Sequence, residues 1–142
     1  MTNVIAVFRP NGPANQTSNH VYVTIATVNA PAGNYVVTAK TKLDEQVENS
    51  ELIDFECQLL SGATVIDNWE DEYNFIATAG NLNTDSTANL QRPVTLTTAG
   101  AIQMQCRASN GTADIGLGTS TWKASWSSII LIPATSINET LQ

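Results

Sequence analysis

Hydrophobic and polar residues alternate most regularly in the stretch AGNYVVTAKTKL, which covers residues 32–43. One set of alternate positions is mostly apolar and consists of Tyr35, Val37, Ala39, Thr41 and Leu43. The other set is more polar and consists of Val36, Thr38, Lys40 and Lys42. A period of two, with β-branched and aromatic residues behind a Gly-Asn turn, predicts a half-buried antiparallel strand.

The same pattern recurs along the chain, between segments rich in Pro, Gly, Asn and Ser. It predicts strands over Val4–Phe8, Val21–Val28, Tyr35–Leu43, Leu52–Leu60, Thr64–Asp67, Tyr73–Thr78, Val94–Thr98, Ile102–Ala108 and Thr121–Ile132. Polar loops are expected at 80–89 and 109–118, and a tight hairpin turn at Ser61-Gly62. No window combines helical apolar spacing with helix caps. The pattern therefore predicts an all-β fold, an antiparallel β-sandwich or barrel.

The last predicted strand is long and apolar on both sides. Alternation assigns one face to Trp122, Ala124, Trp126, Ser128, Ile130 and Ile132, while Ile129 and Leu131 lie on the other. An apolar surplus of this kind is typical of an oligomer interface, so we expect Trp122, Trp126, Ile129 and Leu131 to take part in one. The alternatives for the two tryptophans are a place in the core or in a groove.

Length and charge narrow the class of protein. The 142 residues suit one domain with a hydrophobic share of 42% but only 13% charged residues. The formal net charge is −7 and the six basic residues are scattered, which disfavours nucleic acid and anionic membranes as partners. No run is long enough to predict a membrane span, and the first residues lack the features of a signal peptide. We therefore expect either a chain that is used without Sec export, which a phage-encoded virion protein released by lysis fits, or a chain whose leader has been removed.

The two cysteines, Cys57 and Cys106, both fall on apolar strand faces. Two buried free thiols and a disulfide between the two sheets are the alternatives. A redox or metal role would need closer spacing or further ligands.

Candidate catalytic chemistry is sparse. The single histidine, His20, has no serine elbow or exposed cysteine to work with, and no catalytic, metal or cofactor residue is predicted. Acidic residues are concentrated between positions 44 and 72. A solvated acidic face is the simplest interpretation; a Ca²⁺ loop over 67–72 lacks the usual spacing and glycine, and a glycan hydrolase using these carboxylates is a third alternative.

Exposed aromatic rings stack on sugars, which makes a carbohydrate-binding module a separate possibility. Trp69, next to the acidic run, and nearby Tyr73 are the candidates for ligand contact.

Several motifs together resemble a known module. They are PAGNYVVTAKTKL, FECQLLSG, LTTAGAIQMQCRAS and the closing SSIILIPATSI, within residues 20–133. This set resembles the jelly-roll module of the tumour necrosis factor and complement globular-head type that occurs in bacterial and phage surface or virion proteins. The resemblance implies a jelly-roll-like sandwich that forms a homotrimer and binds or displays rather than catalyses. This chain differs in having no Gly-X-Y repeat before the module.

These features divide the chain into residues 1–19, an arm or first strand, and residues 20–142, a single β-sandwich domain. An arm of this kind would pair with a neighbouring subunit or a host shell. The expected function is a non-enzymatic structural or display protein of a phage particle, such as a capsid decoration or fibre-head protein, located in the virion. Its partners would be copies of itself and capsid or tail proteins. The alternative is a secreted carbohydrate- or receptor-binding module, extracellular or on the cell surface, with a cell-surface glycan as partner.

Overall fold

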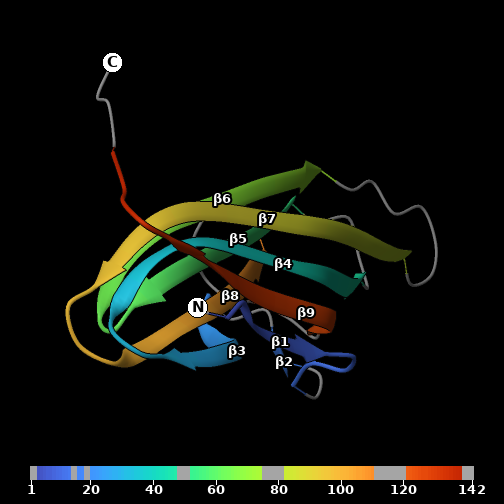
Figure 1. The fold of residues 1–142 in the computed structure, drawn as a ribbon. Coiled ribbons are helices and arrows are strands. Elements are labelled where there is room, and N and C mark those ends of the chain that lie inside the picture. Colours follow the sequence, from blue (N-terminus) through green and yellow to red (C-terminus); the bar gives the residue numbers. More distant parts are fainter. Residues whose placement is uncertain are drawn as a thin grey trace.

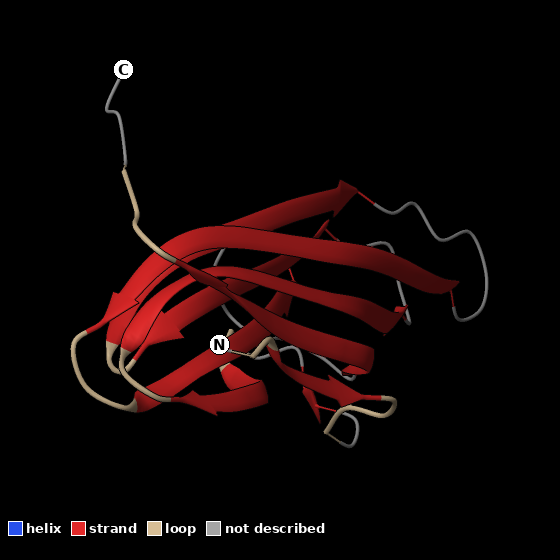
Figure 2. Cartoon of the chain, in the orientation of Figure 1, coloured by secondary structure: helices blue, strands red, loops and turns tan. Residues whose placement is uncertain are grey.

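The computed structural model describes residues 3–13, 16–17, 20–47, 52–74, 82–110 and 121–138. The elements in these ranges are β1 (Ile5–Arg9), β2 (Gln16–Thr17), β3 (Val23–Ala30), β4 (Gly33–Val47), β5 (Leu52–Ser61), β6 (Thr64–Asn74), β7 (Leu82–Leu96), β8 (Gly100–Asn110) and β9 (Thr121–Ala134). All of them are strands (Figure 2). Within the same ranges, no helix is long and apolar enough to cross a membrane.

The strands form two antiparallel sheets, which pack face to face (Figure 1). Sheet A has the order β1-β9-β4-β7, and the short β2 also pairs with β9. Sheet B has the order β3-β8-β5-β6. The core lies between the sheets, where the inward residues of both meet. The predicted all-β antiparallel sandwich is confirmed.

The order of the strands is that of a jelly roll. Leaving β2 aside, the first half of the chain pairs with the second half in nested fashion: β1 with β9, β3 with β8, β4 with β7 and β5 with β6. The pairs β4·β9 and β5·β8 then join these hairpin-like ribbons into two four-stranded sheets. Rolling a long antiparallel ribbon in this way gives the double Greek key that defines the jelly roll.

Strand β4 lies inside sheet A, between β9 and β7, and its alternation follows the sequence prediction. Its inward residues Tyr35, Val37, Ala39, Thr41 and Leu43 are all fully buried. The two polar groups in this row are satisfied. The Tyr35 hydroxyl donates to the Pro31 carbonyl at 3.0 Å, and the Thr41 hydroxyl donates to the Trp126 carbonyl at 2.8 Å.

In sheet B, Cys57 of β5 lies directly opposite Cys106 of β8, and the two are joined by a disulfide. Their Cα atoms are 4.1 Å apart, and both residues are fully buried. The bond therefore links neighbouring strands of one sheet rather than the two sheets. In the same register row, Val23 follows Cys106 on β3 and Trp69 follows Cys57 on β6.

Strand β1 lies at the edge of sheet A, where it pairs with β9 of the same chain. Ile5 and Val7 pack against the core, and the Arg9 guanidinium donates to the Ile25 carbonyl of β3 at 2.8 Å. Residues 5–9 are thus built into the sandwich.

Two segments expected as loops are strands. Residues 67–72, considered as a Ca²⁺ loop, lie within β6, which also absorbs part of the predicted strand Tyr73–Thr78. Residues 82–89, expected in a polar loop, belong to β7 and pair with β4 along their length. The described inward side chains of this part of β7, Ser86 and Ala88, are small, so they give little hydrophobic signal although the backbone is paired.

Candidate interaction surface

The outer face of sheet A carries most of the exposed large hydrophobic side chains of the described residues. Phe8 is 65% exposed on β1, Ile130 and Ile132 are 36% and 47% exposed on β9, and Val4, just before β1, is 59% exposed. On the same face, Ala6 and Ile130 are direct neighbours, and Ile132 is followed by Val36 of β4 and Pro93 of β7. We call this group the apolar end of sheet A: Val4, Ala6, Phe8, Val36, Pro93, Ile130 and Ile132.

The opposite end of the same face is charged. The Lys42 ammonium lies 3.0 Å from Asp85 of β7 and 3.3 Å from Asp44. These hydrogen bonds, that to Asp85 first and that to Asp44 second, raise the pKa of Lys42. Lys123 lies opposite Asp44 in the register, and Lys40 lies between the charged and apolar ends, in the row that contains Phe8. The charges at this end are therefore largely compensated within the chain.

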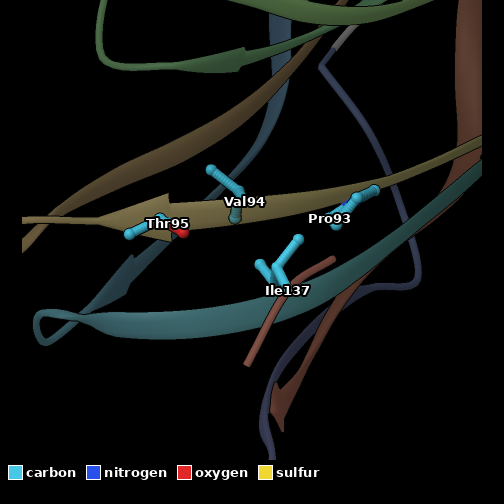
Figure 3. A pocket seen from close by; sticks show the side chains of 4 residues that line it. All are labelled: Pro93, Val94, Thr95 and Ile137. Carbon is cyan, nitrogen blue, oxygen red and sulfur yellow. The ribbon is translucent and has the colours of Figure 1, made fainter. Parts of the chain in front are cut away.

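A pocket of about 290 Å³ adjoins the apolar end. It is lined by Pro93, Val94 and Thr95 of β7 and by Ile137, which follows β9 (Figure 3). Residues 135–138 lead away from the body beyond the end of β9 (Figure 1). The hollow thus lies beside the apolar end, at the β7 edge of the sheet.

The central row of the outer face of sheet B is different, because its side chains are polar and bonded to one another. The Gln58 amide donates to Gln105 at 2.8 Å, and the Gln105 amide donates to Thr24 at 3.2 Å. This ladder crosses β5, β8 and β3 in a single row. A face that satisfies its own polar groups in this way suits contact with water.

A half-buried ionic cluster lies on the same face of sheet B. Glu56 accepts hydrogen bonds from the Arg107 guanidinium at 2.6 Å and from the Tyr22 hydroxyl at 3.1 Å. Arg107 also stacks on the Tyr22 ring, 4.3 Å from its centroid, and His20 Nδ1 lies 3.9 Å from Glu56. Burial first, and the nearby Glu56 second, raise the pKa of Tyr22. The phenol therefore stays protonated at neutral pH, so that it acts as a hydrogen-bond donor and not as a base.

The residues expected at an oligomer interface are divided by a β-bulge in β9. The register with β4 shifts between Lys42 and Leu43, so that Ser125 is an extra residue. Trp122 therefore faces the core, Trp126 faces outward, and the inward row resumes with Ser127, followed by Ile129 and Leu131. Because Trp122, Ile129 and Leu131 are buried in the core, they cannot supply the surface predicted for them. The exposed apolar residues of β9 are Ile130 and Ile132 instead.

The bulge also separates the two tryptophans that alternation had placed on one face. Trp122 is 2% exposed, whereas Trp126 lies on the outer side and is half-buried. The groove lined by both rings is therefore not formed.

Trp69 is not an exposed ring either, because it is half-buried and packs against the hydrophobic core beside Cys57. The backbone of Tyr73 pairs with Ile53 in β6, and its side chain lies outside the described residues. Trp69, the first of the two residues predicted for ligand contact, is therefore not available as an exposed ring.

In the described part of the acidic run, two carboxylates make hydrogen bonds between strands. The Asp67 carboxylate accepts from the Gln91 backbone N–H, and Asp71 accepts from the Ser86 hydroxyl, both at 2.9 Å. These bonds tie β6 of sheet B to β7 of sheet A along one edge of the sandwich. No group of three or more His, Cys, Asp or Glu able to hold a metal ion is found within the described part of the chain.

The fold is similar to that of solved structures from a virus. The chain is similar to a protein chain in the structure of infectious bursal disease virus, Gx strain. The TM-score is 0.56 and the identity is 14%, over 92% of this chain and 32% of the viral chain. The chain matches the VP2 subviral particle of the same virus with a TM-score of 0.54 and 16% identity, over the same shares. The chain therefore spans about a third of the length of these proteins. No protein-family model and no curated protein sequence matches it.

Proposed function

We propose that this protein is a non-enzymatic structural component of a virus particle, located in the virion, which assembles with copies of itself. The single observation that carries the proposal is the complete jelly-roll strand order, β1-β9-β4-β7 over β3-β8-β5-β6. Jelly rolls are a recurrent fold of viral capsids, although lectins and other proteins use it too. The similar structures from infectious bursal disease virus particles support the capsid alternative.

The contacts of the reactive side chains agree with this proposal. Cys57 and Cys106 are bonded to each other, and the Glu56 carboxylate is engaged by Arg107 and Tyr22. These groups hold strands together, and a half-exposed apolar face on the other sheet is suited to contact with protein.

More specifically, we propose a phage particle as the setting, with a capsid-decoration or fibre-head role and a homotrimeric state. The warrant for these details is the resemblance of residues 20–133 to the tumour necrosis factor and complement-head module. Capsid or tail proteins would be the remaining partners.

The direct test is mass spectrometry of particles purified from the source of this sequence. The chain should co-purify with the particles in an amount comparable to that of their other structural proteins. Its absence from particles, together with recovery from the surrounding medium or the cell surface, would overturn the proposal in favour of a secreted binding module. Light scattering of the pure protein tests the trimer separately, because a monomeric mass at micromolar concentration contradicts it.

A further inference from the structure

The two outer faces of the sandwich differ in polarity, so they suit different surroundings. The apolar end of sheet A exposes Phe8, Ile130 and Ile132, whereas sheet B presents the bonded row Thr24, Gln105 and Gln58. Exposed apolar surface is unfavourable in water, and the polar ladder has no such cost. We propose that a second copy of this chain covers the apolar end of sheet A with its own apolar end, while sheet B faces solvent. This inference rests on the proposed self-assembly and not on the homotrimeric state, because two like ends that cover each other form a two-fold contact.

Charge points to a second copy as the occupant. The chain has thirteen acidic and six basic residues, so two copies repel each other over most of their surface. The outer face of sheet A is an exception, because its described charged residues are three lysines, Lys40, Lys42 and Lys123, and two aspartates, Asp44 and Asp85. Copies of this acidic chain can therefore approach through this face with the least repulsion.

The apolar end itself is free of carboxylates. One register row across it runs Ala6, Ile130, Thr38 and Gln91, and the next runs Ile132, Val36 and Pro93. Apposing like ends buries apolar residues against apolar residues and leaves the compensated charges around Lys42 in water. The other exposed large hydrophobic side chains among the described residues are Val21, just before β3, and Val65 on β6, at opposite edges of sheet B. The same end of the second copy is therefore the best-matched apolar surface.

The fold does not depend on the exposed side chains that would form the contact. Ile129 and Leu131, the neighbours of Ile130 in β9, fill the core and are fully buried. Phe8 is 65% exposed, and its neighbours Val7 and Arg9 make the contacts that hold β1. Substitutions at Phe8 and Ile132 therefore test the surface and leave the core intact.

Sedimentation velocity over a range of concentrations tests the proposal with the full chain. Phe8→Lys and Ile132→Lys should each weaken self-association at least about tenfold, because each removes apolar burial and places a charge in the contact. Val65→Lys is the matched control: Val65 is 50% exposed on β6 of sheet B and should leave association unchanged. Urea unfolding of each variant verifies the fold, and the milder Phe8→Ser and Ile132→Thr replace any variant that fails to fold.

Salt gives an independent readout. An apolar contact between two acidic copies should tighten as salt rises from low to physiological concentration, because screening reduces their repulsion. Association that is unaffected by the sheet A variants, or equally weakened by Val65→Lys, would overturn this surface while the proposed function stands. A wild-type chain that stays monomeric at about 100 μM would overturn the contact itself. The proposed function would then be decided by whether the chain is found in purified particles.

Discussion

The disulfide between Cys57 and Cys106 leads to a quantitative prediction about stability. The two residues are 49 positions apart in the sequence but directly opposite each other on β5 and β8. Breaking the bond, either by reduction or by the double substitution Cys57→Ala and Cys106→Ala, releases a long loop in the unfolded chain. The native contacts of the surrounding strands remain available.

The magnitude follows from the entropy of loop closure. For a loop of this length, the cross-link is expected to stabilise the folded state by about 4 kcal/mol at 25 °C. In thermal unfolding, the same change lowers the melting temperature by on the order of 10–15 °C. The double alanine variant should lose slightly more than the reduced wild type, because it also removes two buried sulfur atoms beside Trp69 and Val23.

The assay is equilibrium unfolding in urea, followed by tryptophan fluorescence with and without reductant. The double alanine variant is the control, because a reductant has nothing to act on in it. A wild-type protein whose free energy of unfolding changes by less than about 0.5 kcal/mol on reduction would refute the loop-closure reasoning. Free thiols detected in the native, oxidised protein would refute the bond.

Three further predictions concern the core and the ionic cluster. Leu131→Ala should destabilise the protein by about 2–5 kcal/mol and Ile132→Ala by about 1 kcal/mol or less, because Leu131 is fully buried and Ile132 is not; urea unfolding giving the reverse order would contradict the bulge in β9. Thr41→Val should cost about 1–3 kcal/mol in the same assay, since it removes the hydroxyl that donates to the Trp126 carbonyl, and Thr41→Ser should restore most of the loss. Ultraviolet titration should show Tyr22 ionising above the usual pKa of 10.0, and Glu56→Gln should lower that pKa; the raised pKa implies stability that is present below pH 10.0 and lost as the pH rises through the folded-state value, so an unchanged titration in Glu56→Gln would rule out the assigned role of that carboxylate.

Strong alternation with large inward residues made part of the fold predictable. The row from Tyr35 to Leu43 combines aromatic, β-branched and aliphatic side chains, and all of it is buried as predicted. The hairpin turn after Ser61 was equally clear, because Gly62 takes a positive φ of 60° there, which favours glycine. In these places local preference and tertiary packing agree.

In other segments, pairing with distant strands determines whether the residues form a strand or a loop, and the local sequence does not indicate that pairing. Residues 82–89 look like a polar loop, and their described inward side chains, Ser86 and Ala88, are small, yet the backbone pairs with β4. The acidic residues 67–72 suggest a solvated face or, as an alternative, a Ca²⁺ loop, yet Asp67 and Asp71 bond across to β7. The strand pairing and these hydrogen bonds become visible only when the positions of the neighbouring strands are known.

The candidate surface was partly predictable for a related reason. An apolar surplus in the last strand was visible, but the extra residue Ser125 reverses the faces between Trp122 and Ile129. Phe8 joins the surface only because β1 pairs beside β9, with Phe8 opposite Ser128. A bulge of one residue and a pairing across most of the chain length are not encoded in local alternation.

Chemical cross-linking between copies directly tests whether the apolar ends of sheet A lie against each other. Since the two native cysteines are joined and buried, Ile130→Cys places a single free thiol at the centre of the apolar end, and Thr27→Cys places one on the outer face of sheet B. With a short bifunctional thiol reagent, we expect covalent dimers of Ile130→Cys and none, beyond a random background, of Thr27→Cys. Equal cross-linking of the two variants, or a preference for Thr27→Cys, would contradict it.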